Sequence, residues 1–99
     1  MKVKFPIDFD KDKNFLLKEI RGVSFEDVVE LLKKENVLDD ILHPNQKRYP
    51  NQRIFVIRID EYIYSVPYVI DKKRKRTFLK TIYPNRVLTK KYLKGIKSE

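Results

Sequence analysis

The stretch that decides the fold is RIFVIRIDEYIYSVPYVIDKKRKRTFLKTI, residues 53–82. Its first seven residues, Arg53–Ile59, are almost all β-branched or aromatic, which is typical of a central strand covered on both faces. Asp60-Glu61 predicts a tight turn into a second strand over 62–70, whose one face carries Tyr62, Tyr64, Val66, Tyr68 and Ile70. Because Pro67 has no backbone donor, we expect this strand to lie at an edge or to be bulged there.

The charged run DKKRKR, residues 71–76, holds five consecutive cations and must be solvated. It therefore predicts the turn into a third strand, Thr77–Ile82. Pro84-Asn85 stops that strand and starts a last helix, roughly Arg86–Leu93. These three runs predict an antiparallel meander followed by a helix.

Two helices are predicted before the meander. Asp10 is placed to cap a helix that runs to about Ile20, and Gly22 stands where a helix end favours a left-handed residue. Ser24 opens a second helix with Asp27 three residues on, as in a capping box. That helix is expected to end near residue 35 or 36, and its apolar face carries Phe25, Val28, Val29 and Leu32. An additional strand is possible at Lys2–Ile7.

The composition of the 99 residues indicates one α+β domain, 1–99, whose partner is a polyanion. Lys and Arg number 23 against 14 Asp and Glu, a net charge of +9, which favours nucleic acid, an acidic protein or an anionic surface. Cysteine is absent and glycine occurs only twice, so thiol chemistry and Gly-rich phosphate loops are excluded. No apolar run approaches the roughly 18 to 20 residues of a membrane span. The acids in MKVKFPIDFD do not fit a signal peptide, so we expect a cytoplasmic protein with no membrane contact.

The loop HPNQKRYPNQ, residues 43–52, leads into the first strand with clustered cations. His43 follows Asp39 and Asp40 in a DDxxH spacing that we expect at a helix end, an incomplete set for a metal. We therefore expect no metal and no cofactor, and we interpret His43 as a surface or capping residue, or as a residue that contacts nucleic acid or does acid–base work. Lys47, Arg48 and Tyr49 are either an exposed connector or RNA contacts.

Arg53 heads a strand, so the sheet would hold its guanidinium in place for a bidentate phosphate contact. Lys80 lies in the middle of the third strand and must emerge on an open face; for Lys80, as for Arg58, a structural salt bridge is the alternative. Arg86 starts a helix, which favours anion binding. Cations with neighbouring tyrosines suit single-stranded RNA, and here they include Tyr83, Lys90, Lys91 and Tyr92. For Tyr62, Tyr64 and Tyr68 packing against the sheet is the favoured interpretation.

The chain resembles BrnT-like toxins of the RelE/ParE superfamily of bacterial toxin–antitoxin pairs. The similar segments are IDFDKDKNFLLKEIRGVSFEDVVELL, RIFVIRI and FLKTIYPNRVLTKKYL, and GVSFED is the most specific of their motifs. Two motifs differ, since EIRGVSF stands in place of KHGVSF and YPNR in place of SARR. The resemblance covers roughly residues 5 to 93.

The resemblance implies a RelE-like fold and a metal-independent endoribonuclease in which the 2′-hydroxyl of RNA attacks the adjacent phosphate. Residues of the types it needs are Arg53, Lys80, Tyr83 and Arg86, with RNA contacts from His43, Lys47, Arg48, Tyr49, Lys90, Lys91 and Tyr92. It also implies an acidic antitoxin partner that carries a ribbon-helix-helix DNA-binding domain. The alternatives are a non-catalytic RNA- or ribosome-binding module and an interaction protein whose cations bind an acidic partner.

Overall fold

Strands β3 (Arg53–Ile59) and β4 (Tyr62–Asp71) form the centre of the sheet. They pair antiparallel from Arg53 opposite Tyr68 to Ile59 opposite Tyr62. Asp60, with a φ of 55°, makes the tight turn between them. The computed structural model describes Val3 and residues 5–97, with side chains as far as Leu93 in the last helix. The predicted first hairpin is confirmed.

Four shorter strands complete the sheet in the order β1-β5-β4-β3-β2, with β6 (Tyr83–Pro84) also paired to β4. β5 (Arg76–Leu79) continues the predicted meander, and β2 (Asp39–Leu42) adds an antiparallel strand beside β3. β1 (Ile7–Phe9) pairs with β5 in parallel. The extra strand expected at Lys2–Ile7 thus shares only Ile7 with β1, and residues 1, 2 and 4 lie outside the described residues.

The two N-terminal helices begin and end on the residues that local chemistry favours. Asp10 accepts the amide of Lys13 at the start of α1 (Lys11–Arg21), and Gly22 ends that helix with a φ of 69°. In α2 (Phe25–Lys33), Ser24 and Asp27 form the predicted capping box. α2 ends two residues before the predicted range begins, because Glu35 turns into the left-handed region with a φ of 55°.

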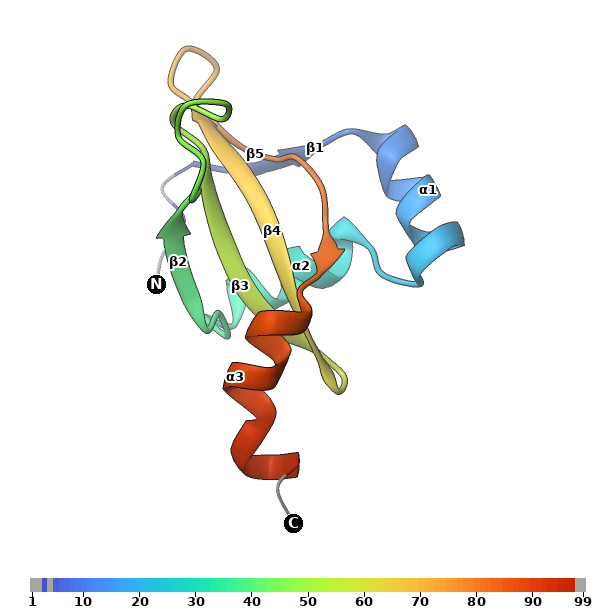
Figure 1. Ribbon diagram of the computed structural model, residues 1–99. Coiled ribbons are helices and arrows are strands. Elements are labelled where there is room, and N and C mark those ends of the chain that lie inside the picture. Colours follow the sequence, from blue (N-terminus) through green and yellow to red (C-terminus); the bar gives the residue numbers. More distant parts are fainter. Residues whose placement is uncertain (1–2, 4, 98–99) are drawn as a thin grey trace.

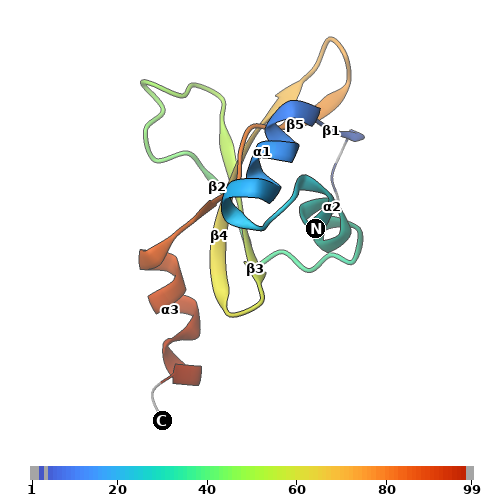
Figure 2. The same cartoon turned by 90° about the vertical axis from the view of Figure 1, so that its right-hand side faces the viewer.

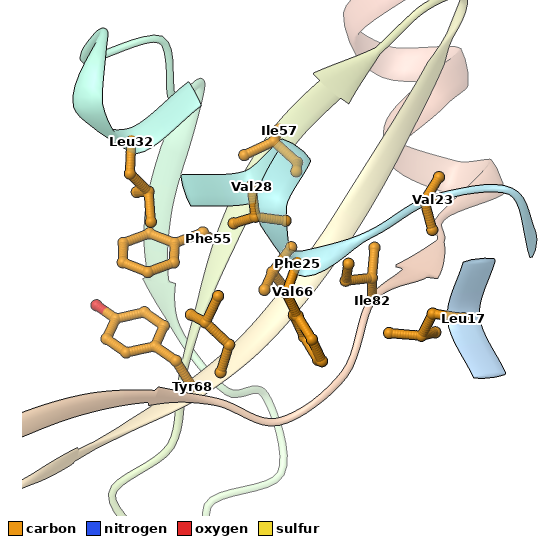
Figure 3. Close-up of a cluster of buried hydrophobic side chains, with 11 residues drawn as sticks. Leu17, Val23, Phe25, Val28, Leu32, Phe55, Ile57, Val66, Tyr68 and Ile82 are labelled. Atoms are coloured by element: carbon orange, nitrogen blue, oxygen red, sulfur yellow. The ribbon is translucent and has the colours of Figure 1, made fainter. Parts of the chain in front are cut away.

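One face of the sheet packs against α2 and forms the main core (Figure 3). Phe25 and Val28 of α2 are fully buried against β3 and β4, together with Phe55, Ile57 and Val66. Burying side chains of this size stabilises a fold by about 1.5–3 kcal/mol each. α1 buries two residues, Asn14 and Leu17.

The last helix, α3 (Arg86–Lys97), lies on the other face of the sheet from α1 and α2 (Figure 2). Its Leu93 is buried with Ile54, Val56 and Ile63. The side chain of Asn85 accepts the amide of Leu88 at 3.0 Å and donates to Ser65 at 3.1 Å. These contacts fix the start of the helix on β4. Within the part of the chain that the structure describes, none of the helices has the length and apolar character of a membrane span.

Both edge strands carry an aspartate that occupies backbone groups of its own strand. In β1, Asp8 accepts the amide of Phe9 at 2.9 Å, and in β2, Asp39 accepts the amide of Asp40 at 2.8 Å. The carbonyl of Asp40 accepts a further bond from Arg53, at 2.9 Å. Edge strands expose unpaired groups on which another strand can add, so this arrangement protects the sheet from edge-to-edge association.

Candidate RNA-binding face

The α3 side of the sheet is covered by α3 only in part. Figure 2 shows that the 43–52 loop and α3 both project from this side, opposite α1 and α2. The sheet surface between them carries half-buried Val69, Phe78 and Tyr83 together with the exposed Lys80. We call this surface, with His43 at its β2 edge, the open face.

A break in pairing opposite Pro67 shapes the open face. Leu79 of β5 pairs with Tyr68, and the amide of Lys80 donates to the carbonyl of Pro67 at 2.8 Å. Pro67 has no N–H to return the bond, so regular pairing between β4 and β5 ends here. Pairing resumes with Tyr83 opposite Ser65. The chain therefore takes three residue steps from Lys80 to Tyr83 where β4 takes two, from Pro67 to Ser65. β4 is a central strand, so the edge alternative predicted at Pro67 is wrong, and the extra residue of the bulge lies in the segment between β5 and β6 and not in β4 itself.

The bulge brings Lys80 and Tyr83 onto the same face. Their partners Pro67 and Ser65 lie two residues apart on β4 and therefore share a face, about 7 Å from each other along the strand. The ammonium group of Lys80 lies 5.6 Å from the ring centroid of Phe78, a cation–π contact on that face. Bulges commonly redirect side chains next to functional sites, and this one sets a cation beside a phenol.

Arg86 comes three residues after Tyr83, is the first residue of α3 and is exposed. Lys90 and Lys91 are exposed one turn further on, and the Lys91 ammonium lies 5.9 Å from the Tyr92 ring centroid. Among the described residues, no carboxylate forms an ion pair with Lys80 or these three cations. The start of a helix attracts anions, so these cations extend the open face as a surface suited to phosphate.

His43 belongs to the opposite edge of the open face. Its amide donates to the carbonyl of Gln52, which places it two residues beyond Ile41 on the α3 side of the sheet. Its Nδ1 accepts a hydrogen bond from the amide of Asn45, and its ring contacts that of Tyr49 at a tilt of 36°, with centroids 4.4 Å apart. Three strand spacings, about 14 Å, separate it from Lys80, so the two do not meet one phosphate.

The 43–52 loop is held in one shape by its own side chains. Gln46 donates to the carbonyls of His43 and Gln52, and Asn45 accepts the amide of Arg48. The Arg48 guanidinium then lies 5.5 Å from the centroid of the Tyr49 ring. Arg48 and the neighbouring Lys47 remain exposed. The loop therefore presents an aromatic ring with cations around it, the combination that binds unpaired bases and phosphates.

Arg53 lies on the other face of the sheet, toward α2. Its Nε donates to Asp40 Oδ1 at 3.0 Å, and both Asp40 carboxylate oxygens lie 2.7 Å from the Tyr68 hydroxyl. The hydrogen bond to Asp40 raises the pKa of Arg53. The pKa of Tyr68 is raised mainly by burial and, to a lesser extent, by its hydrogen bond to Asp40. Arg53, Asp40 and Tyr68 thus tie β2 to β3 and β4.

The structure therefore places Lys80 and Tyr83 on one face of the sheet, with Arg86 three residues after Tyr83 at the start of α3, and it places Arg53 on the other face. Two details of the sequence analysis need correction. Lys80 follows the end of β5 because Pro67 interrupts pairing, and Asp39 and Asp40 belong to strand β2 and not to a helix end. In the described residues there is no group of three metal-ligating side chains.

Asp40 is the residue whose role sequence reasoning missed. In the sequence Asp40 stands out only as part of the DDxxH spacing, and no local pattern predicts β2 or the pairing of Asp40 with Arg53. Comparisons of the chain with protein-family models, curated proteins and solved structures find no match. The resemblance to BrnT-like toxins therefore stays a sequence prediction.

Proposed function

We propose that this protein is a metal-independent endoribonuclease of the toxin type and that RNA binds on its open face. The observation that carries this proposal is the bulge opposite Pro67, which places Lys80 and Tyr83 on one face of the sheet, with Tyr83 three residues before the helix start at Arg86. A cation and a phenol beside a helix start are groups that stabilise and protonate a phosphate in transfer. The sequence resemblance to RNA-cleaving toxins supports the same conclusion.

In the proposed reaction the RNA 2′-hydroxyl attacks the neighbouring phosphorus. The new O2′–P bond forms as the P–O5′ bond breaks, giving a 2′,3′-cyclic phosphate and a free 5′-hydroxyl. Water accepts the proton of the 2′-hydroxyl, while Tyr83 donates a proton to the leaving 5′-oxygen and regains one from water afterwards. Lys80 and Arg86 stabilise the negative charge that builds up on the phosphate oxygens. His43, Tyr49 and Arg48 hold a neighbouring nucleotide at the far edge of the face.

The experiment incubates the protein with RNA in excess chelator and analyses the product ends. Cyclic phosphate and 5′-hydroxyl ends are expected, with cleavage lowered by about 10² or more in Lys80→Ala. Lys33→Ala is the matched control, because Lys33 is an exposed cation on α2, behind the sheet. Equal cleavage by both variants, or cleavage that requires a divalent metal, would contradict the proposal.

A non-catalytic RNA-binding module is the second candidate, and the distribution of the side chains favours it. An enzyme needs its groups around one phosphate. Here Arg53 faces α2, and His43 stands about 14 Å across the sheet from Lys80. Tight RNA binding with no cleavage by the wild-type protein would select this candidate.

We further propose an acidic antitoxin with a ribbon-helix-helix domain as the protein's partner, whose acidic segment covers Lys80 and Arg86. Opposite charges steer association, and salt weakens this steering. The test measures association with the product of the adjacent gene at about 50 and 500 mM salt, which shortens the Debye length several-fold. An association rate that does not fall with salt, or the absence of a complex, would count against this partner.

A further inference from the structure

The turn between β4 and β5 carries more charge than a turn requires. The turn and the first residue of β5 carry five consecutive cations, which we call the basic hairpin: Lys72, Lys73, Arg74, Lys75 and Arg76. We propose that the basic hairpin is a second RNA site, separate from the open face, that binds phosphates without regard to sequence. The proposal takes RNA as the ligand from the function proposed above.

The charges of the basic hairpin are nearly uncompensated. All five side chains are exposed, and Asp71 is the acid that organises the turn. It accepts the amide of Arg74 at 3.1 Å, and its other oxygen lies 4.0 Å from the Arg74 Nε. One carboxylate faces five cations, so the folded hairpin holds like charges close together, and their mutual repulsion opposes its closure.

The backbone of the turn also disfavours this sequence. Lys75 has a φ of 56°, in the left-handed region where glycine and asparagine are preferred. Neither turn geometry nor hairpin stability therefore accounts for a lysine at this position. What the five residues have in common is positive charge, which indicates that the charge itself has a use.

The chemistry of the basic hairpin matches a phosphate backbone better than a membrane or a protein. Residues 72–76 include no apolar or aromatic side chain that could insert into a bilayer interface. Protein interfaces depend on aromatic and apolar anchors and are depleted of lysine at their centre. Phosphate contacts need only exposed cations and carry no base preference.

The position of the basic hairpin allows it to act on the same RNA as the open face. It lies at the end of the sheet where the 43–52 loop also lies, and α3 lies toward the other end (Figure 1). β4 runs seven residues from Tyr64, opposite Pro84, to Asp71, which is about 23 Å. An RNA strand that leaves the open face past Lys47 and Arg48 can therefore reach the basic hairpin.

The test compares the salt dependence of RNA binding in two triple variants of the full chain. Lys72→Gln, Lys73→Gln and Lys75→Gln remove hairpin charge, and Lys11→Gln, Lys13→Gln and Lys33→Gln remove the same charge from α1 and α2. The probes are a single-stranded RNA of about 16 nucleotides, the upper end of the site sizes of small domains, and its duplex. Affinity is measured between about 50 and 200 mM salt, where phosphate contacts dominate the salt response.

Affinity falls as salt rises, and this fall should be less steep in the hairpin variant. The magnitude of the slope of log affinity against log salt is expected to decrease by about 2 on single-stranded RNA, since three contacts contribute about 0.7 each. The hairpin variant should bind the duplex more weakly as well, because phosphates are present in both. The α1 and α2 variant should keep the wild-type slope. This control removes the same net charge, so the comparison isolates the position of the cations.

Two outcomes separate this inference from the proposed function. If the hairpin variant keeps the wild-type slope while Lys80→Ala weakens binding, the RNA site on the basic hairpin is wrong and the open-face site stands. The hairpin cations then serve another partner, such as an acidic protein. If the hairpin variant has a smaller slope of log affinity against log salt while Lys80→Ala binds and cleaves RNA as the wild type does, the basic-hairpin site stands and the open-face site is wrong. A wild-type protein that binds neither probe overturns both.

Discussion

Replacing Arg53 by alanine separates the two roles that sequence and structure give this residue. As the catalytic phosphate ligand expected from sequence, Arg53 could be removed without harm to the fold. In the structure its guanidinium donates hydrogen bonds to the carboxylate and to the backbone carbonyl of Asp40. The same carboxylate also accepts a hydrogen bond from the Tyr68 hydroxyl. We therefore expect Arg53→Ala to lower stability and to leave RNA cleavage by the folded protein unchanged.

The size of the effect follows from the two bonds that are lost. A hydrogen bond to a charged group contributes about 1.5–3 kcal/mol when it is well shielded. The Arg53 side chain is 39% exposed and that of Asp40 18%, so solvent reduces the loss to about 1–2 kcal/mol in total. For a domain of this size that corresponds to a fall in melting temperature of about 5–10 °C.

The assay is a double-mutant cycle of Arg53→Ala with Asp40→Ala, followed by thermal unfolding and by RNA cleavage at equal folded concentration. Because the two side chains act as a pair, the double variant should lose less stability than the sum of the two single losses. Asp40→Ala leaves Arg53 in place, so it serves as the matched control for activity. A fully stable Arg53→Ala protein that loses about 10² in cleavage rate would refute this reasoning and return Arg53 to the catalytic set.

Three further predictions concern other parts of the fold. Burial raises the pKa of the Tyr68 phenol above its ordinary 10.0, so Tyr68 ionises in the unfolded chain before it ionises in the folded protein, and its contribution to stability falls as the pH rises above about 10. Tyr68→Phe should lack this fall when unfolding is followed from about pH 8 to 11. A parallel decline in both proteins would contradict the assignment. Asn85→Ala should cost about 1–2 kcal/mol in denaturant unfolding, because it removes the cap on Leu88 and the bond to Ser65; an unchanged midpoint would show that these bonds do not hold α3. Asp39→Ala frees the edge amide of β2 and should increase self-association in sedimentation experiments, whereas a strictly monomeric variant would mean that the edge is protected by other means.

The elements that the sequence predicted correctly are those whose signal is local. The capping box at Ser24, the left-handed Gly22 and the apolar run of β3 each depend on a few neighbouring residues. β2 was missed because DDIL, residues 39–42, has no alternating apolar pattern and pairs only through contacts with β3. β1 pairs in parallel with a strand about 70 residues later, which no local pattern indicates.

The candidate site divides in the same way. Tyr83 and Arg86 are close in sequence, and the interrupted pairing opposite Pro67, a residue that the sequence marked as irregular, brings Lys80 to the same face as Tyr83. The partner of Arg53 is Asp40, 13 residues earlier in a strand that sequence did not reveal. A cation at the start of a strand fits a phosphate ligand and an ion pair equally well until the neighbouring strand is known.

The most direct measurement of the central claim is the set of backbone amide NMR shifts that change when a non-cleavable RNA with 2′-deoxy substitution is added. We predict that the largest changes lie at Lys80, Tyr83 and Arg86, with further changes at His43 and Tyr49. The amides of α1 and α2, behind the sheet, should be nearly unaffected. Changes centred on α1 and α2, with the open face silent, would contradict the account.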